Sequence, residues 1–259
     1  MNGKIEISSL ADYISQIGKI TTSEKSYLYR GQENEDWQVN SSAYRRLERQ
    51  HGDSSDVSSD VLHRLWRAYL EQIIDEIKLR YPSTYRTLHP LECMAHLQHN
   101  KVATGLIDFT FSPLVALWVA CSNKDINGKV FVLENENENL KEIDTLETLQ
   151  RDLSAFFGEN QERWYLWSPT LDSRTVDTER MTMQQSVFLF GLPEMDSEMM
   201  AQEIAIPAEH KENLRQDLAK MGISEETLFS DLLGFFERNT QEQPYDLRLV
   251  TANEGEALP

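Results

Sequence analysis

The stretch YLYRGQENEDWQVNSSAYRRL, residues Tyr27–Leu47, combines a β-prone segment with a cluster of arginines in a chain of net charge -18. The segment YLYRG ends at Gly31, a residue suited to a turn, so Arg30 lies at the end of a predicted strand. Two interpretations follow. Arg30, Arg45 and Arg46 are solvated cations that pair with nearby acids, or Arg30 points into a pocket and binds an anion through its planar set of donors.

The composition is that of a folded protein. The chain has 259 residues, of which 40% are hydrophobic and 26% are charged, and this length accommodates one large domain or one domain with an appendage. Asp and Glu number 43 against 25 Lys and Arg, which argues against the many phosphate contacts of non-specific duplex DNA binding. Duplex DNA is therefore not an expected partner, whereas a protein or a small molecule is compatible with this charge.

The sequence shows no pattern for a metal site or a membrane segment. The six histidines form no HExxH motif and no Cys–His pair with zinc-ligand spacing, so no metal is expected. Cys93 and Cys121 lie in apolar segments without CxxC spacing, which predicts two buried, reduced thiols. No window reaches the roughly 18 continuous apolar residues of a membrane span. We therefore expect a cytoplasmic protein with no membrane partner.

Hydrophobic periodicity predicts both strands and helices along the chain. Strands are predicted at residues 4–8, 26–31, 105–112, 128–134, 186–193 and 202–209. Helices are predicted at residues 10–19, 40–49, 58–81, 91–100, 113–122, 145–157, 209–223, 224–229 and 231–240. Residues 134–144 are interpreted as a polar connection, and residues 164–182 receive no assignment. Because the elements do not alternate strictly, we expect an α+β fold in a single domain.

Common nucleotide-binding and hydrolase motifs are absent from the sequence. It contains no GxGxxG after a strand, no GxxxxGK[ST] and no GxSxG. Rossmann, P-loop and α/β-hydrolase folds are therefore not expected.

Three stretches, taken in order, resemble the FRG-domain family, which is named for an aromatic-Arg-Gly motif. The first contains Tyr29-Arg30-Gly31-Gln32, followed by Trp37 and by Arg45 at the family's second arginine position. The second is LQHNKVATGLIDFTFSPLVALWVA, whose matching residues are Gln98, His99, Thr104, Asp108, Thr110, Ser112 and Pro113. The third runs from Gln184 to Phe188 and is followed by EIAIP and GISEETLFSDLLG.

The resemblance also predicts how the chain is divided. It covers residues 25–237, and it leaves residues 1–24 as an N-terminal strand–helix extension and residues 238–259 as a C-terminal tail. The chain departs from the family pattern at four positions. Lys101, Ala103 and Gly105 stand where Gly, Pro and Arg are usual, and Ser186 stands where Gly is usual. The missing arginine removes an anion contact unless Lys101 replaces it, so an inactive member remains an alternative.

The order of the three stretches is remotely similar to that of the ADP-ribosyltransferase superfamily. In those enzymes a first strand carries Arg or His, a second ends in Ser or Thr before a helix, and a third carries a catalytic Glu or a substitute. The segments YLYRG, IDFTFSPLVALWVA and QQSVFLF follow this order. The similarity implies a mixed, ADP-ribosyltransferase-like sheet flanked by helices, with NAD as co-substrate.

The same similarity implies two sets of site residues. The catalytic candidates are Arg30, Asp108, Thr110, Gln184 and Glu203. The cofactor-binding candidates are Arg30, Gly31, Gln32, Trp37, Arg45, His99, Thr104 and Ser112.

Several candidates have a structural interpretation beside the functional one. Arg30 binds a phosphate or a ribose, or it forms a salt bridge to Asp108 that joins two strands. Trp37 stacks on a nicotinamide or adenine ring, which is worth on the order of 1–3 kcal/mol, or it covers the core. Arg45 binds a second phosphate or lies on a solvated helix face. His99 has an ordinary pKa of about 6.5 and serves as acid, base or donor, or it is structural.

The roles of the remaining candidates follow from their functional groups. Asp108 is expensive to bury alone, so we expect it to pair with Arg30 or Lys101 and to orient Arg30. Gly31 allows a close approach of the main chain to the ligand. Thr110 hydrogen-bonds a ribose hydroxyl.

The last three candidates lie at a helix start and in the later strands. Ser112 caps a helix and in addition contacts a ribose hydroxyl. Gln184 cannot take a proton but can orient a hydroxyl group. Glu203 is the candidate acid that stabilises an oxocarbenium-like state.

Three functions remain for comparison. The first is an NAD-dependent ADP-ribosyltransferase or NAD-cleaving enzyme, a bacterial or phage toxin or defence effector that acts on a protein or nucleotide substrate and has an antitoxin or regulatory partner. The second is a catalytically inactive module of the same fold that binds a nucleotide or a partner protein. The third is a nucleic-acid modifier or nuclease that acts on a single strand, which the acidic composition disfavours.

Overall fold

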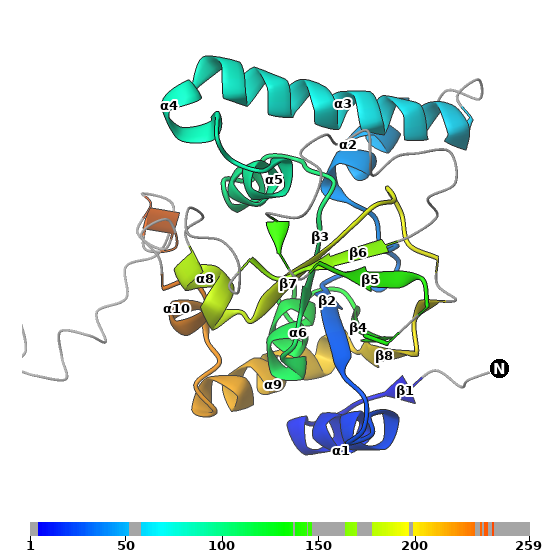
Figure 1. Cartoon of the computed structure of the whole chain (residues 1–259). Helices are drawn as coiled ribbons and strands as arrows, with labels where there is room; N and C mark the ends of the chain where they lie inside the picture. Colours follow the sequence, from blue (N-terminus) through cyan, green and yellow to red (C-terminus); the bar gives the residue numbers. More distant parts are fainter. Residues whose placement is uncertain are drawn as a thin grey trace, which may run out of the picture.

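Eight strands in the described part of the chain form one mixed sheet (Figure 1). They are β1 (Ile5–Glu6), β2 (Tyr27–Gln32), β3 (Ile107–Thr110), β4 (Gly128–Glu134), β5 (Leu140–Glu142), β6 (Trp164–Trp167), β7 (Ser186–Phe190) and β8 (Gln202–Ile206). Their order across the sheet is β1-β8-β4-β2-β3-β7-β6-β5. The pairs β1–β8 and β5–β6 are parallel, and the other pairs are antiparallel.

Helices flank the sheet, so the α+β class predicted from the sequence is confirmed. The helices are α1 (Leu10–Ile20), α2 (Ser42–His51), α3 (Ser59–Arg80), α4 (Pro82–Tyr85), α5 (Pro90–His99), α6 (Pro113–Ala120), α8 (Thr178–Met183), α9 (Ala208–Lys220) and α10 (Glu225–Leu228). This computed structural model describes residues 5–51, 58–136, 138–143, 145–146, 164–169, 178–196, 199–230, 234, 236–237 and 240.

The sequence predictions for individual elements agree with most of these bounds. Two strands were not predicted: β5 lies inside the stretch interpreted as a polar connection, and β6 lies in the unassigned stretch. The extension at residues 1–24 is not separate from the sheet, because β1 pairs with β8. Most of the helices predicted at 145–157 and 231–240 and of the tail at 238–259 lies outside the described residues.

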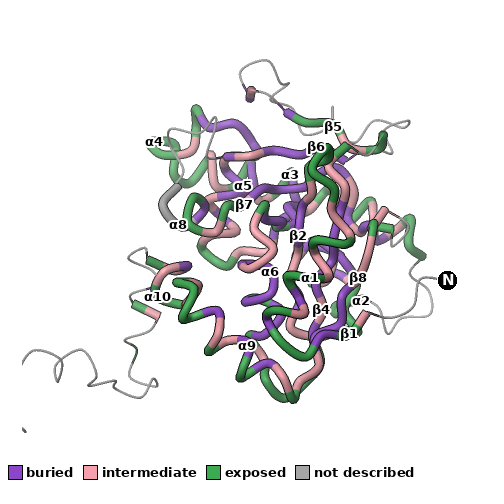
Figure 2. The backbone as a smooth tube through the Cα atoms, turned by 90° about the horizontal axis from the view of Figure 1, so that it is seen from below, coloured by how far each residue is buried: buried purple, intermediate pink, exposed green. Residues whose placement is uncertain are grey.

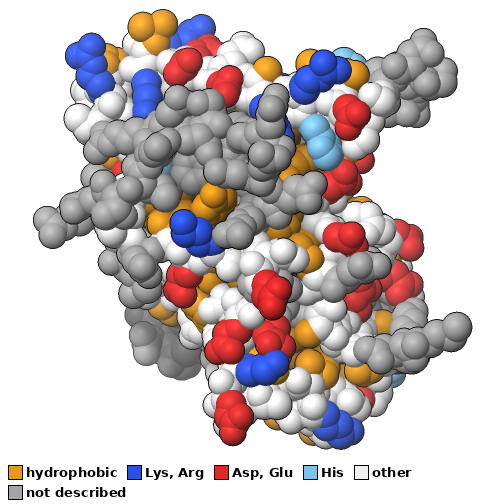
Figure 3. Space-filling model, turned by 45° about the vertical axis from the view of Figure 1, so that its right-hand side comes forward, with side chains coloured by type: hydrophobic (Ala, Val, Ile, Leu, Met, Phe, Trp, Pro, Cys, Tyr) orange, Lys and Arg blue, Asp and Glu red, His pale blue; other side chains and the backbone are white. Residues whose placement is uncertain are grey.

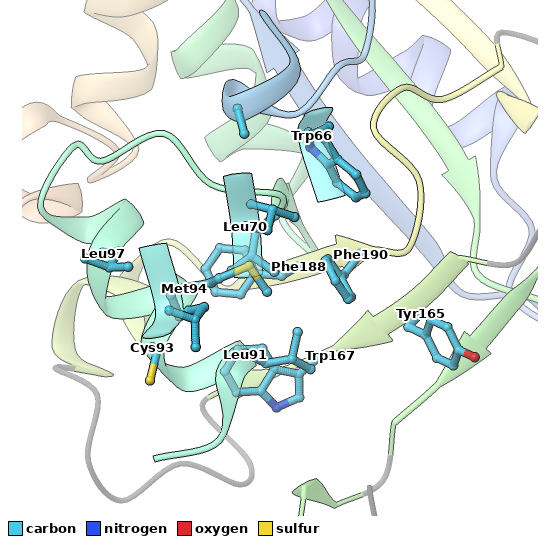
Figure 4. Close-up of a cluster of buried hydrophobic side chains, with 14 of the residues drawn as sticks. Trp66, Leu70, Leu91, Cys93, Met94, Leu97, Tyr165, Trp167, Phe188 and Phe190 are labelled. Atoms are coloured by element: carbon cyan, nitrogen blue, oxygen red, sulfur yellow. The ribbon is translucent and has the colours of Figure 1, made fainter. Parts of the chain in front are cut away.

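Two groups of helices cover the same face of the sheet. Residues directly opposite each other in an antiparallel pair project to one face, so Tyr29, Thr110 and Ser186 share a face. The helices α1, α6 and α9 bury apolar side chains against β2, β4 and β8 on this face. The helices α2, α3 and α5 pack together with β6 and β7 around Trp66, Leu91, Trp167 and Phe190 (Figure 4).

The opposite face of the sheet carries a third cluster. Its members come mainly from alternate positions of the central strands, including Leu28, Phe131, Val187 and Leu189. As a result the central strands are buried for most of their length, as the tube in Figure 2 shows. Cys93 and Cys121 are free and buried, which confirms the prediction for both cysteines. Among the described helices none has the length and apolar character needed to cross a membrane.

Gly31 allows helix α6 to lie directly against strand β2. A Cβ atom added to Gly31 would lie 1.9 Å from the carbonyl oxygen of Ala116 and 2.8 Å from the amide nitrogen of Ala120. Both atoms belong to the main chain of this helix and its end, so neither can move aside as a flexible side chain would. The absence of a side chain at Gly31 therefore sets the distance between β2 and α6.

Lys211 connects three segments from inside the protein. The side chain lies on α9 with no exposed surface. Its Nζ donates hydrogen bonds to the carbonyl oxygens of Glu33 at 2.9 Å and Asn123 at 2.8 Å. Burial lowers the pKa of Lys211, since desolvation disfavours the charged form. These bonds hold the chain that follows β2 and the chain that follows α6 against α9.

Substitution of Gly31 by alanine is expected to destabilise the fold. The added methyl group overlaps main-chain atoms of α6, and overpacking of this kind costs about 3 kcal/mol. Gly18→Ala is the matched control, because Gly18 lies within α1 and its Cβ position is empty. Alanine at Gly18 should raise the free energy of unfolding by about 0.5–1 kcal/mol. Urea denaturation of both variants measures these changes, and equal stabilities would contradict the close packing.

Candidate functional site

The site begins where the pairing between β2 and β3 stops. These strands are paired at one position, Tyr29 opposite Thr110, whereas the pairing of β2 with β4 continues from Tyr27 to Gln32. Next to this pair the carbonyl oxygen of Asp108 accepts a hydrogen bond from Nη1 of Arg30 at 2.6 Å. A side-chain donor thus binds a main-chain oxygen at the point where the two strands are no longer paired.

Arg30 is a half-buried cation, and one of its hydrogen-bond donors has no partner among the described residues. Its Nε is buried and has no hydrogen-bond partner among the described residues. Burial lowers the pKa of Arg30 to about 10; the charge of Asp108 opposes this shift and Arg45 adds to it. At neutral pH the guanidinium is still protonated. Because a buried donor without a partner is unfavourable, this side chain is suited to an anionic or polar ligand.

Asp108 differs from the sequence expectation. Its side chain is exposed, and its carboxylate forms no ion pair with Arg30 or Lys101 in the described structure. Instead Oδ1 accepts a hydrogen bond from Nε2 of Gln98 at 2.7 Å. The expected salt bridge is therefore wrong, because β3 leaves Asp108 where the strand pairing has ended and water can reach it. Asp108 orients Arg30 through its main chain.

Gln98 is in turn held by Thr104. The buried hydroxyl group of Thr104 donates to Oε1 of Gln98 and accepts a hydrogen bond from the amide of Leu106 at 3.2 Å. This contact leaves the amide group of Gln98 directed at Asp108. Thr104 consequently acts on the site through Gln98, and it is not among the residues that line the two pockets described next.

The first pocket, called the strand pocket here, lies between α5 and α6 over β2, β3 and β7. Figure 1 shows these two helices on either side of β3 and β7. Its volume is about 320 Å³. Its polar lining consists of Arg30, Gln98, His99, Asp108, Thr110, Gln184 and Ser186. Its aromatic lining consists of Phe109, Trp118, Phe188 and Phe229. This mixture of apolar walls and a few polar groups is typical of small-molecule sites.

The second pocket, called the basic pocket here, lies between α2 and the connection from α5 to β3. Its volume is about 540 Å³. Five cationic side chains line it, namely Arg30, Arg45, Arg46, Arg49 and Lys101, together with one carboxylate, Asp108. This concentration of cations contrasts with the net charge of -18. On the face in Figure 3, for example, Asp and Glu side chains are spread over the lower half of the molecule.

The two pockets share Arg30, Gln98 and Asp108. The predicted site residues Arg30, Gly31, His99, Asp108, Thr110 and Gln184 line the strand pocket, and Arg45 lines the basic pocket. The motifs at residues 29–32, 98–110 and 184–188 are therefore brought together in space. Gly31 also lies against α6, so its missing side chain serves helix packing as well as the pocket.

Four further predicted residues lie outside the lining of both pockets. Glu203 lies on β8, with Oε2 at 3.2 Å from Nζ of Lys129. Trp37 follows β2 and is 45% exposed. Gln32 is buried and donates through Nε2 to the carbonyl oxygen of Gln38 at 3.1 Å. Ser112 accepts a hydrogen bond from the amide of Val115 as the N-cap of α6.

Thr110 and Gln184 are both partly engaged by the protein itself. Oγ1 of Thr110 donates to the carbonyl oxygen of Gln184 at 2.7 Å and accepts from the amide of Ser112 at 3.0 Å. Nε2 of Gln184 donates to the carbonyl oxygen of Leu228 at 3.0 Å. No hydrogen bond to Oε1 of Gln184 is present among the described residues, so this oxygen can still accept one.

The apolar walls of the strand pocket were not predicted as site residues. Trp118, Phe188 and Phe229 have the spacing of ordinary core residues, and no local signal separates them from the core. Arg49 was also missed, although it follows Arg45 by one helical turn and lines the same pocket. A search for cations on one helix face would have found it.

Lys101 occupies a backbone conformation that usually requires glycine. Its φ angle is 62°. The amide of Lys101 donates to the carbonyl oxygen of Gln98, and the amide of Val102 donates to that of Leu97. These two bonds form the Schellman motif that ends many helices at a left-handed residue. A lysine in this left-handed conformation is therefore strained.

Replacement of Lys101 tests this strain. A left-handed residue other than glycine costs about 1 kcal/mol or more, so Lys101→Gly should be more stable than Lys101→Ala by about 1 kcal/mol. Both variants lose the ion pair between Lys101 and Glu237, so the alanine variant controls for it. Chemical denaturation gives the difference in the free energy of unfolding. A glycine variant no more stable than the alanine variant would refute the strain.

A comparison with family models gives a match over part of the chain. Within the described residues no three His, Cys, Asp or Glu side chains are grouped so that they could hold a metal ion. No curated protein and no solved structure matches the chain. The family model described as the FRG domain matches residues 25–129, which include β2, β3 and the arginines of both pockets. Residues 25–129 of the chain are therefore similar to the FRG domain.

Proposed function

We propose that the chain binds a dinucleotide such as NAD across the two pockets and is an ADP-ribosyltransferase-like toxin or defence effector of a bacterium or phage. The observation that carries the proposal is Arg30, a half-buried cation whose buried Nε has no partner among the described residues and which lies at the junction of an aromatic pocket and a basic pocket. A dinucleotide has the matching order of groups, with a pyrophosphate between two ring systems. A cytoplasmic location and a neutralising or regulatory partner belong to the same proposal.

The strand pocket supports the binding of a ring and its ribose. Phe188, Phe229 and Trp118 supply aromatic surface, and stacking of a base on an aromatic side chain contributes about 1–3 kcal/mol. Oε1 of Gln184 is available to accept a hydrogen bond from a ribose hydroxyl. In this arrangement the pyrophosphate lies at Arg30, whose guanidinium offers charge-assisted hydrogen bonds.

The reaction would need a stabilised ribose cation. In transfer from NAD, the bond between the nicotinamide nitrogen and ribose C1′ breaks, and C1′ bonds to a nucleophile of the acceptor, which loses a proton. A nearby carboxylate lowers the energy of the oxocarbenium-like state. Asp108 is the carboxylate that lines the pockets. We assign this electrostatic role to Asp108, since Glu203 lines neither pocket.

The variant Arg30→Ala tests NAD binding. Loss of a charged hydrogen-bond donor costs about 1.5–3 kcal/mol, so the dissociation constant for NAD should rise about 10- to 150-fold. Arg80→Ala is the control, because Arg80 lies on the exposed part of α3 and pairs with Glu76. Calorimetry with NAD measures affinity, and circular dichroism verifies folding. If wild-type protein binds no NAD, the proposal is wrong.

A catalytically inactive nucleotide-binding module is the second candidate. It is favoured because Oδ1 of Asp108 already accepts a hydrogen bond from Gln98, and the hydroxyl group of Thr110 already donates one to the carbonyl oxygen of Gln184. Incubation with labelled NAD and cell lysate separates the two candidates. Transfer or NAD cleavage that Asp108→Asn abolishes, with NAD affinity retained, supports the enzyme. Binding of NAD by the wild type without transfer or cleavage supports the module.

A further inference from the structure

The arginines of the basic pocket are positioned by neutral groups. Nη1 of Arg30 donates to the carbonyl oxygen of Asp108, and Nη1 of Arg45 donates to the carbonyl oxygen of Asn40. Nε of Arg49 donates to the carbonyl oxygen of Arg45 at 3.3 Å. Nη1 of Arg46 donates to the hydroxyl oxygen of Tyr69 at 3.2 Å.

Tyr69 makes one further contact with Arg46 and is itself held by the main chain. The guanidinium of Arg46 lies over the Tyr69 ring, 5.5 Å from its centroid. The hydroxyl group of Tyr69 donates to the carbonyl oxygen of Ala103 at 2.9 Å. Arg46 is therefore fixed at the edge of the pocket although its side chain is exposed.

None of these four arginines pairs with a carboxylate in the described part of the chain. Cations elsewhere do, as in the pairs Lys25–Glu134, Arg80–Glu76, Lys129–Glu203 and Lys220–Asp217. The acid nearest in sequence is Glu48, which lies on α2 among the arginines, and its Oε2 accepts instead from Asn40 at 3.4 Å. The positive charge of the pocket is thus kept available in a chain with 43 acidic residues.

This arrangement is unfavourable without an anion. Arg45 and Arg49 are one helical turn apart on α2, and like charges at this spacing destabilise a helix. Burial lowers the pKa of Arg45; the charge of Asp108 opposes this shift, Arg49 adds to it, and Glu48 opposes it. A bound anion would remove this repulsion.

The number of cations exceeds what a dinucleotide pyrophosphate requires. The pyrophosphate of NAD carries two negative charges, whereas four arginines line the basic pocket in addition to Lys101, which Glu237 neutralises. Arg30 and Arg45 suffice for the pyrophosphate. Arg46 and Arg49 then remain, and guanidinium groups of this kind bind terminal phosphates in a bidentate manner.

We propose that Arg46 and Arg49 form a subsite for a phosphate group additional to the pyrophosphate, so that the ligand is a phosphorylated dinucleotide of the NADP type rather than NAD. This inference rests on the proposed function. A small molecule is favoured over a nucleic-acid strand because the cations line one pocket of about 540 Å³. The net charge of -18 would also repel a long polyanion that extends beyond it.

The test compares NADP with NAD by calorimetry at low salt. Wild-type protein should bind NADP about tenfold or more tightly than NAD, because the extra phosphate gains charged hydrogen bonds. The double variant Arg46→Ala/Arg49→Ala should bring this ratio close to one while it changes NAD affinity less than about threefold. The variant Arg64→Ala/Arg80→Ala is the matched control. It removes two arginines from α3 that do not line the basic pocket, and it should keep the ratio.

Other outcomes separate the subsite from the proposed function. Equal binding of both dinucleotides by the wild type, or a ratio that survives the double variant, overturns the subsite and leaves NAD binding intact. If neither dinucleotide binds, the proposed function fails. In that case inorganic tripolyphosphate is the probe. Binding of tripolyphosphate to the wild type but not to the double variant would still support a phosphate subsite, and absence of binding to the wild type would overturn the subsite.

Two controls complete the experiment. A single-stranded oligonucleotide that binds more tightly than NADP, and loses binding in the double variant, would overturn the assignment to a small molecule. Should the double variant fail to fold by circular dichroism, Arg49→Gln serves in its place. Arg49 is exposed and donates through its side chain only to its own helix, so this variant should fold and reduce the NADP preference.

Discussion

The end of pairing between β2 and β3 is the constraint on which the site depends. A continuous ladder would have occupied the carbonyl oxygen of Asp108 with a main-chain donor. Because pairing is limited to Tyr29 and Thr110, this oxygen is free to hold the guanidinium of Arg30. The same separation lets the strand pocket and the basic pocket meet at Arg30. Helix α6, held close by Gly31, forms the second wall.

Much of this fold could be predicted from the sequence because its elements carry strong local signals. The helix at residues 58–81 was predicted from hydrophobic periodicity and the Ser112 cap of α6 from its residue type, and both are present. Strand β6 was missed because Trp164–Trp167 is too short to show alternation, and all four of its residues are buried. Strand β5 lies at the edge of the sheet, where its side chains face solvent. Its sequence is therefore polar and lacks the alternation of apolar residues by which a strand is predicted.

The sequence motifs identified several residues that line the candidate site, whereas residues that join it through tertiary contact were missed. Arg30, Asp108, Thr110 and Gln184 were named from sequence, and all four line the strand pocket. Glu203 was chosen for its place near a strand start, but strand order puts β4 and β2 between β8 and β3. Contacts such as that between Gln98 and Asp108 depend on a helix end and a strand meeting in space, which local sequence does not encode.

The buried ammonium of Lys211 has a consequence for the interpretation of genetic screens. Its two partners are the carbonyl oxygens of Glu33 and Asn123. Glu33 lies just after β2, which carries Arg30, and Asn123 lies in the segment after α6, which packs against Gly31. A substitution of Lys211 removes the ammonium donor that both carbonyl oxygens share. The segments released in this way are continuous with β2 and α6, which form walls of the strand pocket, although Lys211 does not line that pocket. In a selection for loss of activity, Lys211 would score alongside true ligand contacts. Only a measurement of the free energy of unfolding would distinguish this structural role from a role in ligand binding.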